Sequence, residues 1–162
     1  MDVLIRKGTR EDMSSVYGLI QELAQFENEP EAVEISVDDL IRDGFKAVPE
    51  FEVFVAEHSG QIVGIALYYR RYSTWKGRSL HLEDLIVSKD FRGQGIGRAL
   101  YKQVIKTAYE AGMNRLEWEV LDWNQNAIDF YKSSGADMLE NWNICQMTKS
   151  NMKQFVERDA RI

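Results

Sequence analysis

The stretch DFRGQGIGRAL, residues 90–100, contains the clearest chemical signal in the chain. Three glycines alternate with other residues directly before an apolar run of helical period: Gly93, Gly95 and Gly97. Backbone N–H groups at the start of a helix have no partner within the helix, and glycine lets an anion approach them closely. Basic side chains flank the glycines: Lys89, Arg92 and Arg98. The stretch therefore predicts a pyrophosphate-binding turn that follows a strand.

Three other interpretations of these glycines are possible. A Walker loop requires Lys-Ser or Lys-Thr after the last glycine, and neither is present. A dinucleotide fingerprint requires G-x-G-x-x-G, whereas the spacing here is G-x-G-x-G, although Glu117 lies about 20 positions further on. A doubly wound nucleotide fold would also need more strand–helix units than the rest of the chain can provide. A flexible loop without a ligand stays open as an alternative.

Acidic side chains form a second signal. In RLEWEVL, residues 115–121, Glu117 and Glu119 alternate with apolar residues, which predicts that both project from one face of a strand. Residues 11–43 hold ten acidic residues and a single base, Arg42. The acidic positions could bind an ammonium group, as the basic residues near the glycines could bind an anion. They could equally be solvated faces, and the sequence leaves both interpretations open.

The composition predicts one soluble domain over residues 1–162. The net charge of −6 argues against a nucleic-acid partner, and the apolar runs are too short to span a membrane. No signal peptide is recognisable at the N-terminus. Cys145 is the only cysteine, so we expect a reducing, cytoplasmic compartment and a thiol buried in a strand. With two histidines and one cysteine, no metal site is expected.

The hydrophobic periodicity predicts the element order β-α-α-β-β-β-α-β-α-β. Capping boxes at Thr9–Asp12 and Ser36–Asp39 predict two early helices, to about Phe26 and to about Phe45. Strands are predicted in DVLIRK, FEVFVAEH, IVGIALYYRRY, SLHLEDLIV, RLEWEVL and, last, MLENWNICQMTK. Helices are predicted after the glycines and in WNQNAIDFYKSSGA. The fold class is α/β (α+β): a mixed, mostly antiparallel sheet with helices on both faces.

Two motifs at once resemble a known family. R-G-Q-G-I-G after LEDLIV resembles the R/Q-x-x-G-x-G/A motif of the GNAT N-acetyltransferases, here with Arg92, Gly95 and Gly97. The later N-x-x-A-x-x-F-Y resembles the second half of that family's acetyl-CoA site, here with Asn124, Ala127, Phe130 and Tyr131. The resemblance covers essentially the whole chain and implies a GNAT-like fold with acetyl-CoA as cosubstrate.

Within that family, the chain is most similar to the spermidine/spermine (diamine) and thialysine N-acetyltransferases. ELAQFE, HLEDLIV and DWNQNAIDFYKSSGA resemble ELAKYE, YLEDFFV and EWNEPSINFYKRRGA of this branch. Phe26 replaces a tyrosine near the substrate end, and Gln125-Asn126 replaces Glu-Pro. The resemblance also implies a homodimer. The candidate acetyl-CoA-binding residues are Leu85, Ile86, Val87, Arg92, Gly93, Gln94, Gly95, Ile96, Gly97, Arg98, Asn124, Ala127 and Tyr131.

Amine acetylation needs a proton acceptor and a proton donor. An alkyl ammonium has a pKa around 10, so it must lose a proton before it attacks a thioester. Strand alternation puts His81, Glu83 and Leu85 on one face and Asp84 on the other, and the resemblance also assigns a water-linked base to Glu83. Glu83 could instead only attract the amine. Tyr131 lies on the helix face of Ala127 and Asn124, and the resemblance makes it the general acid, although it could be a core aromatic.

The same resemblance assigns a splayed strand at Leu85–Val87 to the thioester oxygen and the pantetheine arm. The candidate residues for the amine are Phe26, Glu27, Glu83, Glu117, Trp118 and Glu119. We therefore expect an acetyl-CoA-dependent N-acetyltransferase that acts on a small cationic amine. Two alternatives stay open: an acetyl-CoA-binding regulatory module with little turnover, and a protein or peptide N-acetyltransferase.

Overall fold

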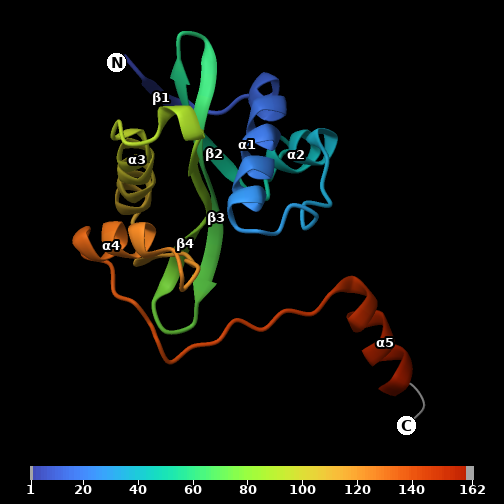
Figure 1. Ribbon diagram of the computed structural model, residues 1–162. Helices are drawn as coiled ribbons and strands as arrows, with labels where there is room; N and C mark the ends of the chain where they lie inside the picture. Colours follow the sequence, from blue (N-terminus) through green and yellow to red (C-terminus); the bar gives the residue numbers. More distant parts are fainter. Residues whose placement is uncertain (1, 160–162) are drawn as a thin grey trace. The chain divides into compact units, whose positions relative to one another are not determined.

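A computed structural model describes residues 2–159 (Figure 1). The chain forms two compact units, one that runs to Leu121 and one that begins at Asp122. The first unit contains β1 (Leu4–Lys7), α1 (Met13–Phe26), α2 (Val37–Gly44), β2 (Glu52–His58), β3 (Gln61–Ser73), β4 (Gly77–Val87), α3 (Ile96–Glu110) and β5 (Arg115–Glu117). The second unit contains α4 (Gln125–Ser133) and α5 (Lys149–Asp159).

The five strands form one sheet in the order β1-β2-β3-β4-β5. The first four strands pair antiparallel, whereas β5 runs parallel to β4. The β2–β3 hairpin turns at Ser59 and Gly60, whose φ angles of 50° and 79° fit a tight turn between twisted strands. Helix α3 makes the crossover from β4 to β5. The predicted fold class, a mixed and mostly antiparallel sheet with helices on both faces, is confirmed.

The helices of the first unit cover opposite faces of its sheet (Figure 1). Helices α1 and α2 pack on one face, over a core formed by Met13, Val16, Leu19, Leu40, Val53, Val55, Ile65, Leu67 and Ile86. Helix α3 covers the other face. It approaches the sheet closely at Gly64, where a Cβ atom would lie 3.0 Å from the carbonyl oxygen of Ile86 and 3.2 Å from Cδ1 of Leu100. A side chain at Gly64 would therefore push α3 away from the sheet.

Both predicted capping boxes are present. The Thr9 N–H donates to Oδ2 of Asp12 at 2.7 Å, ahead of a short 3-10 turn that leads into α1. The Asp39 N–H donates to Oγ of Ser36 at 3.2 Å, and the Ser36 N–H donates back to Asp39 at 2.9 Å. These bonds satisfy amides that precede the first helical hydrogen bonds, so both helices begin where the sequence predicted.

Strand β4 departs from regular pairing at two points. Leu67 of β3 pairs with Asp84 and Tyr68 pairs with Leu82, so Glu83 is an extra residue in β4, a β-bulge. Strand β5 then pairs with β4 only from Ser79 to His81. In the described part of the chain, no strand pairs with the outer edge of β4 after His81.

The predicted last strand is wrong. Residues 138–148 are irregular, and Lys149–Asp159 form helix α5 where the sequence analysis expected a strand end and a polar tail. A strand needs a partner edge for its hydrogen bonds, and strand propensity alone does not supply one. Several side chains of the expected strand are exposed, including Leu139, Trp142 and Ile144. Cys145 is also exposed, which corrects its predicted burial.

Candidate active site

The glycine turn before α3 adopts a conformation that glycine alone tolerates well. Gly93 and Gly95 have φ angles of 76° and 81°, and a Cβ atom at either would meet no other atom within 4 Å. The first hydrogen bond into α3 runs from the Ala99 N–H to the Gly95 carbonyl, at 3.0 Å. The amides of Ile96, Gly97 and Arg98 come before it and are those that a helix leaves available to an anion. The turn therefore has the open space and the donors that a diphosphate needs.

Arg92 links the start of this turn to the rest of the first unit. Its Nε donates to the Val87 carbonyl at 2.8 Å, and its Nη2 donates to Glu22 of α1 at 3.2 Å. The guanidinium also lies over the ring of Phe26, with Cζ 5.3 Å from the ring centre. Glu22 accepts a further bond from the Lys89 N–H at 2.8 Å. Arg92 thus fixes the turn against the end of β4 and against α1, in addition to any contact with a ligand.

The end of β4 lies directly before this turn. Leu85, Ile86 and Val87 pair on one side with β3, at Ala66, Ile65 and Gly64. On the other side, β5 has already left β4 after His81. Among the described residues, no strand pairs with this outer edge at Leu85–Val87. The role that the family resemblance assigns to these residues stays a prediction.

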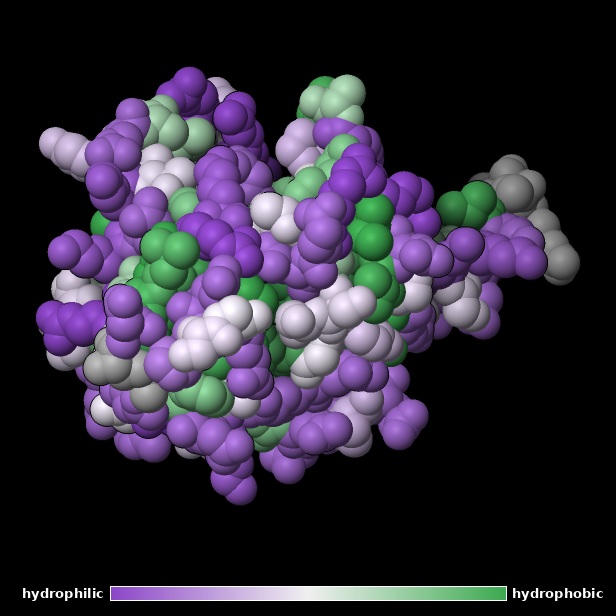
Figure 2. Space-filling view, turned by 90° about the horizontal axis from the view of Figure 1, so that it is seen from above, coloured by the Kyte–Doolittle hydropathy of each residue, from purple (hydrophilic) through white to green (hydrophobic). Residues whose placement is uncertain are grey.

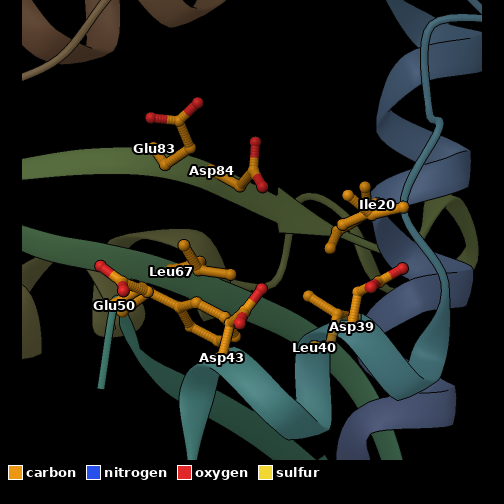
Figure 3. Close-up of a pocket in the computed structure, with 10 residues that line it drawn as sticks. Ile20, Asp39, Leu40, Asp43, Glu50, Leu67, Glu83 and Asp84 are labelled. Atoms are coloured by element: carbon orange, nitrogen blue, oxygen red, sulfur yellow. The ribbon is translucent and has the colours of Figure 1, made fainter. Parts of the chain in front are cut away.

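A pocket of about 270 Å³ opens on the α1–α2 face of the sheet (Figure 3). Its apolar lining comes from α1, α2, β3 and the connecting segments: Ile20, Ile35, Leu40, Phe51 and Leu67. Every charged residue of its lining is acidic: Asp39, Asp43, Glu50, Glu83 and Asp84. An apolar floor with an acidic rim suits a substrate with an alkyl chain and a positive charge.

The position of Asp84 corrects the sequence analysis. Regular alternation predicted that Asp84 points away from Glu83, but both residues line the same pocket. The bulge is the reason, because the extra residue breaks the alternation of side chains along β4. In Figure 3, Glu83 and Asp84 lie side by side on β4, across the pocket from Asp39 and Asp43 of α2. Nothing in the alternating pattern HLEDLIV signals an inserted residue.

The acidic side chains of the pocket differ in their partners. Arg42 forms ion pairs with Asp39 at 2.6 Å and with Asp43 at 2.8 Å, and Lys46 pairs with Glu50. Among the described residues, no Lys or Arg lies within ion-pair distance of Glu83 or Asp84. Burial raises the pKa of Asp84 to about 7, and the negative charges of Glu83 and Glu27 contribute. The carboxylates on β4 are therefore the ones available to an incoming cation.

Among the other residues predicted to bind the amine, Glu27 influences the pocket through its charge. It is half-buried, and burial raises its pKa. Phe26 is exposed on one side and is covered by the Arg92 guanidinium. The charge of Glu27 acts on Asp84, so the end of α1 contributes to the electrostatics of the site.

Glu117 and Glu119, which were predicted to share one face of a strand, do not do so in the structure. The strand ends at Glu117, so Glu119 lies beyond it. Glu117 already has two cationic partners, Arg71 at 2.7 Å and Arg115 at 2.9 Å. Trp118 packs edge-on against Tyr101 of α3, with ring centres 5.5 Å apart. None of these residues lines the acidic pocket.

The second unit contains the remaining predicted residues. Asn124 caps α4, because its Oδ1 accepts a hydrogen bond from the Ala127 N–H at 3.3 Å. Tyr131 follows one helical turn after Ala127, and its side chain is buried. The structure thus brings Asn124 and Ala127 together and gives Asn124 a structural part in the motif.

Two kinds of feature are absent from residues 2–159. No group of three or more His, Cys, Asp or Glu residues there is placed to hold a metal ion. None of the helices in this range has the length and apolar character of a membrane span.

Comparison with known proteins identifies the family. Residues 16–136 match the Acetyltransferase (GNAT) family. A thialysine N-epsilon-acetyltransferase of Bos taurus is 39% identical over 164 residues, which cover 94% of this chain and 96% of that protein. The spermidine/spermine N(1)-acetyltransferase-like protein 1 of Homo sapiens is 35% identical over 158 residues, 91% of this chain and 23% of that protein. A V. cholerae integron cassette protein of known structure has a TM-score of 0.79 at 25% identity, covering 97% of this chain and 99% of its own.

The fold and these relatives define an acyltransferase. The chain belongs to the GNAT family of acetyltransferases, whose members use acetyl-CoA as cosubstrate. The resemblance stated from the sequence, including the likeness to the thialysine and spermidine/spermine enzymes, is confirmed. The family match spans both compact units, because it runs from residue 16 to residue 136.

Proposed function

We propose that the chain transfers the acetyl group of acetyl-CoA to a primary amine of a small cationic substrate by direct attack in a ternary complex. The substrate class is a diamine, a polyamine or a lysine- or thialysine-like amine. The observation that carries the proposal is the acidic pocket, in which Glu83 and Asp84 have no Lys or Arg partner among the described residues. The relatives named for thialysine and spermidine/spermine acetylation support the same class.

The first step is binding and deprotonation of the amine. The carboxylates of the pocket attract an ammonium group, and the apolar floor accepts its alkyl chain. Glu83 is the proposed proton acceptor, directly or through a water molecule. Asp84 is a second acceptor, because a carboxyl group with a pKa of about 7 takes up a proton readily near neutral pH.

The second step is acetyl transfer. Amides of the glycine turn and of the first turn of α3 bind the diphosphate, and the open edge at Leu85–Val87 binds the pantetheine arm and the thioester oxygen. The amine nitrogen forms a bond to the acetyl carbon as the carbon–sulfur bond breaks. Tyr131 donates its proton to the departing thiolate and regains one from the solvent. The products are an acetylated amine and a free thiol, with one proton released overall.

The proposal is tested with the full chain, acetyl-CoA and a panel of diamines, polyamines, lysine and thialysine, by following free thiol. We expect amine-dependent thiol release far above the amine-free background. Tyr131→Phe should lower turnover by something like 10²-fold with little change in acetyl-CoA affinity, whereas Tyr109→Phe, which alters an exposed tyrosine of α3, should not. Tight acetyl-CoA binding without thiol release would instead support a regulatory module.

We further propose one cytoplasmic catalytic domain that forms a homodimer. The exposed free thiol of Cys145 supports a reducing compartment, and the family resemblance supports the dimer. Light scattering of the purified chain measures the oligomeric state directly, and a monomer at micromolar concentration would contradict the dimer.

A further inference from the structure

His81 is a buried histidine next to the acidic pocket. Its side chain lies on β4 two residues before Glu83, and the residue as a whole is only 6% exposed. Its ring stacks on Tyr69 of β3, with ring centres 5.0 Å apart. Its Nε2 lies 3.5 Å from a carboxylate oxygen of Glu83, and its Nδ1 lies 3.4 Å from Nη1 of Arg71. One ring nitrogen therefore faces a hydrogen-bond acceptor, and the other faces a donor.

These two neighbours determine where the imidazole proton sits. An arginine side chain has only donors and stays protonated in proteins, so Nδ1 must act as the acceptor toward Arg71. The single proton of the neutral ring is then on Nε2, which faces the Glu83 carboxylate. Both contacts are long, at 3.4 Å to Arg71 and 3.5 Å to Glu83.

Arg71 is itself held in place. Its Nη1 lies 2.7 Å from Oε1 of Glu117 on β5, and Glu117 also pairs with Arg115 at 2.9 Å. A row of side chains thus runs from Glu117 through Arg71 and His81 to Glu83. The row crosses three adjacent strands of the first unit, in which His81 pairs with both Tyr69 and Glu117.

Glu83 needs such support, because it sits on a bulge and its side chain is 51% exposed. One contact comes from Tyr69, whose pKa is raised to about 12 by burial, by the charge of Glu83 and by its hydrogen bond to Glu83. The Nε2 of His81, 3.5 Å from Oε2 of the same carboxylate, is placed to become a second donor when this contact shortens. Two donors on neighbouring strands restrict the rotamers that this carboxylate can adopt.

We propose that His81 is a positioning residue for Glu83: Arg71 fixes the neutral Nε2–H tautomer, and this N–H orients the carboxylate at the pocket. The charged and titratable groups that surround the ring are Tyr69 and Arg71 of β3, Glu83 of β4, and Glu117 and Arg115 of β5. The catalytic part of this inference rests on the proposed function, whereas the tautomer does not.

The tautomer is tested by nitrogen NMR of the full chain without any substrate. The sequence contains only two histidines, so His58→Gln assigns both rings. We expect the neutral ring of His81 to carry its proton on Nε2, and Arg71→Leu to abolish that preference. Arg70→Leu removes a neighbouring cation whose charge acts on Tyr68 instead, and it should leave the spectrum of His81 unchanged. An Nδ1–H tautomer of the neutral ring in the unmutated chain would overturn the proposal.

The positioning role is tested by comparing His81→Phe with His81→Gln. Phenylalanine keeps the stacking on Tyr69 without a donor, whereas the glutamine amide restores an N–H donor at similar reach. We expect His81→Phe to lower kcat on the order of 10-fold, the scale of one hydrogen bond to a charged group, and His81→Gln to recover most of it. Acetyl-CoA affinity should not change in either. Equal losses in both variants, with thermal unfolding unchanged, would overturn the role.

The two measurements separate the possible failures. If the unmutated chain acetylates no amine, the proposed function fails, and the NMR result still decides the tautomer. If acetylation is observed but His81→Phe retains full kcat, the positioning role fails and the proposed function stands.

Discussion

Two acidic groups line the same pocket and behave in opposite ways. On α2, hydrogen bonds from Ser36, and then from Arg42, lower the pKa of Asp39 to about 2. On β4, burial, and then the charges of Glu83 and Glu27, raise the pKa of Asp84 to about 7. Asp39 is ionised at any physiological pH and already neutralised by a guanidinium. Asp84 exchanges a proton near pH 7 and has no Lys or Arg partner within reach among the described residues.

This difference shows that lining the pocket does not by itself make a carboxylate available to a substrate. Asp39 belongs to the helix cap, and Asp39 and Asp43 share Arg42, which balances one of their two charges. Neither Glu83 nor Asp84 has a Lys or Arg partner among the described residues. The partners of a carboxylate, rather than its presence in a pocket, decide whether it can bind and deprotonate an amine.

The largest expected effect comes from removing the β4 carboxylates. Glu83→Gln and Asp84→Asn should each lower kcat/KM roughly 10²-fold, the scale of general-base catalysis, and the double variant should lose less than the product because the two act together. Asp43→Asn should change kcat/KM less than about 3-fold, as expected for a partly exposed carboxylate paired with Arg42. Initial rates of thiol release measure all four. An equal loss in Asp43→Asn would mean that the pocket acts only as a negative surface.

The next effect concerns stability and pH. The folded pKa of Asp84, about 7, lies above its ordinary 3.8, so the folded chain binds the extra proton and stability falls as pH rises between these values. Asp84→Asn should raise the free energy of unfolding at pH 8 by about 2 kcal/mol, less than the ~4 of the full shift because the pocket is open to water. Near pH 4 the gain should vanish. Urea unfolding at both pH values tests this, and a pH-independent gain would contradict it.

A smaller loss is expected from the capping box of α2. Ser36→Ala removes the acceptor for the Asp39 N–H and should cost about 1 kcal/mol of stability while leaving kcat unchanged. Because the pKa of Asp39 lies below its ordinary value, its stabilisation should be lost as pH falls from about 4 toward 2. Acid unfolding of the unmutated chain and of Ser36→Ala measures this loss of stability. A fall in kcat would show that α2 contributes to catalysis as well as to folding.

The smallest effect should follow from releasing the α2 carboxylates. Arg42→Gln leaves Asp39 and Asp43 unpaired, which should lower KM for a diamine about 2-fold at low salt and not at high salt. Lys102→Gln removes the same charge from the exposed surface of α3 and serves as the control. If both variants lower KM equally, net charge rather than the pocket is responsible.

Much of the fold follows from local signals in the sequence. The capping residues Thr9 and Ser36 fix two helix starts, because a cap depends on residues three positions apart. The glycine turn was also predictable, since Gly93 and Gly95 need positive φ angles that few other residues tolerate. The family resemblance likewise depended on short motifs, and the Bos taurus relative is 39% identical over 94% of this chain.

The predictions that are wrong share one cause. Each depends on how segments that are distant in the sequence pair with one another. Asp84 enters the pocket because of how β4 aligns with β3, and no residue within HLEDLIV reveals that register. Glu119 falls outside β5 because β5 leaves β4 after three pairs. The expected last strand has suitable residues but forms no ladder in the structure. The strand face of His81 does not by itself predict its contact with Arg71, which lies ten positions earlier on another strand.

Glu83 and Asp84 both line the pocket because β4 contains one extra residue. Their placement therefore depends on the number of residues in this strand as well as on their types. Replacing either carboxylate leaves the backbone count intact, so the site loses a charge and retains its shape. Deleting one residue between Leu82 and Leu85 would restore regular pairing between β3 and β4 and leave one carboxylate in the pocket instead of two. Insertion or deletion in β4 is therefore the change that would most directly separate these two carboxylates.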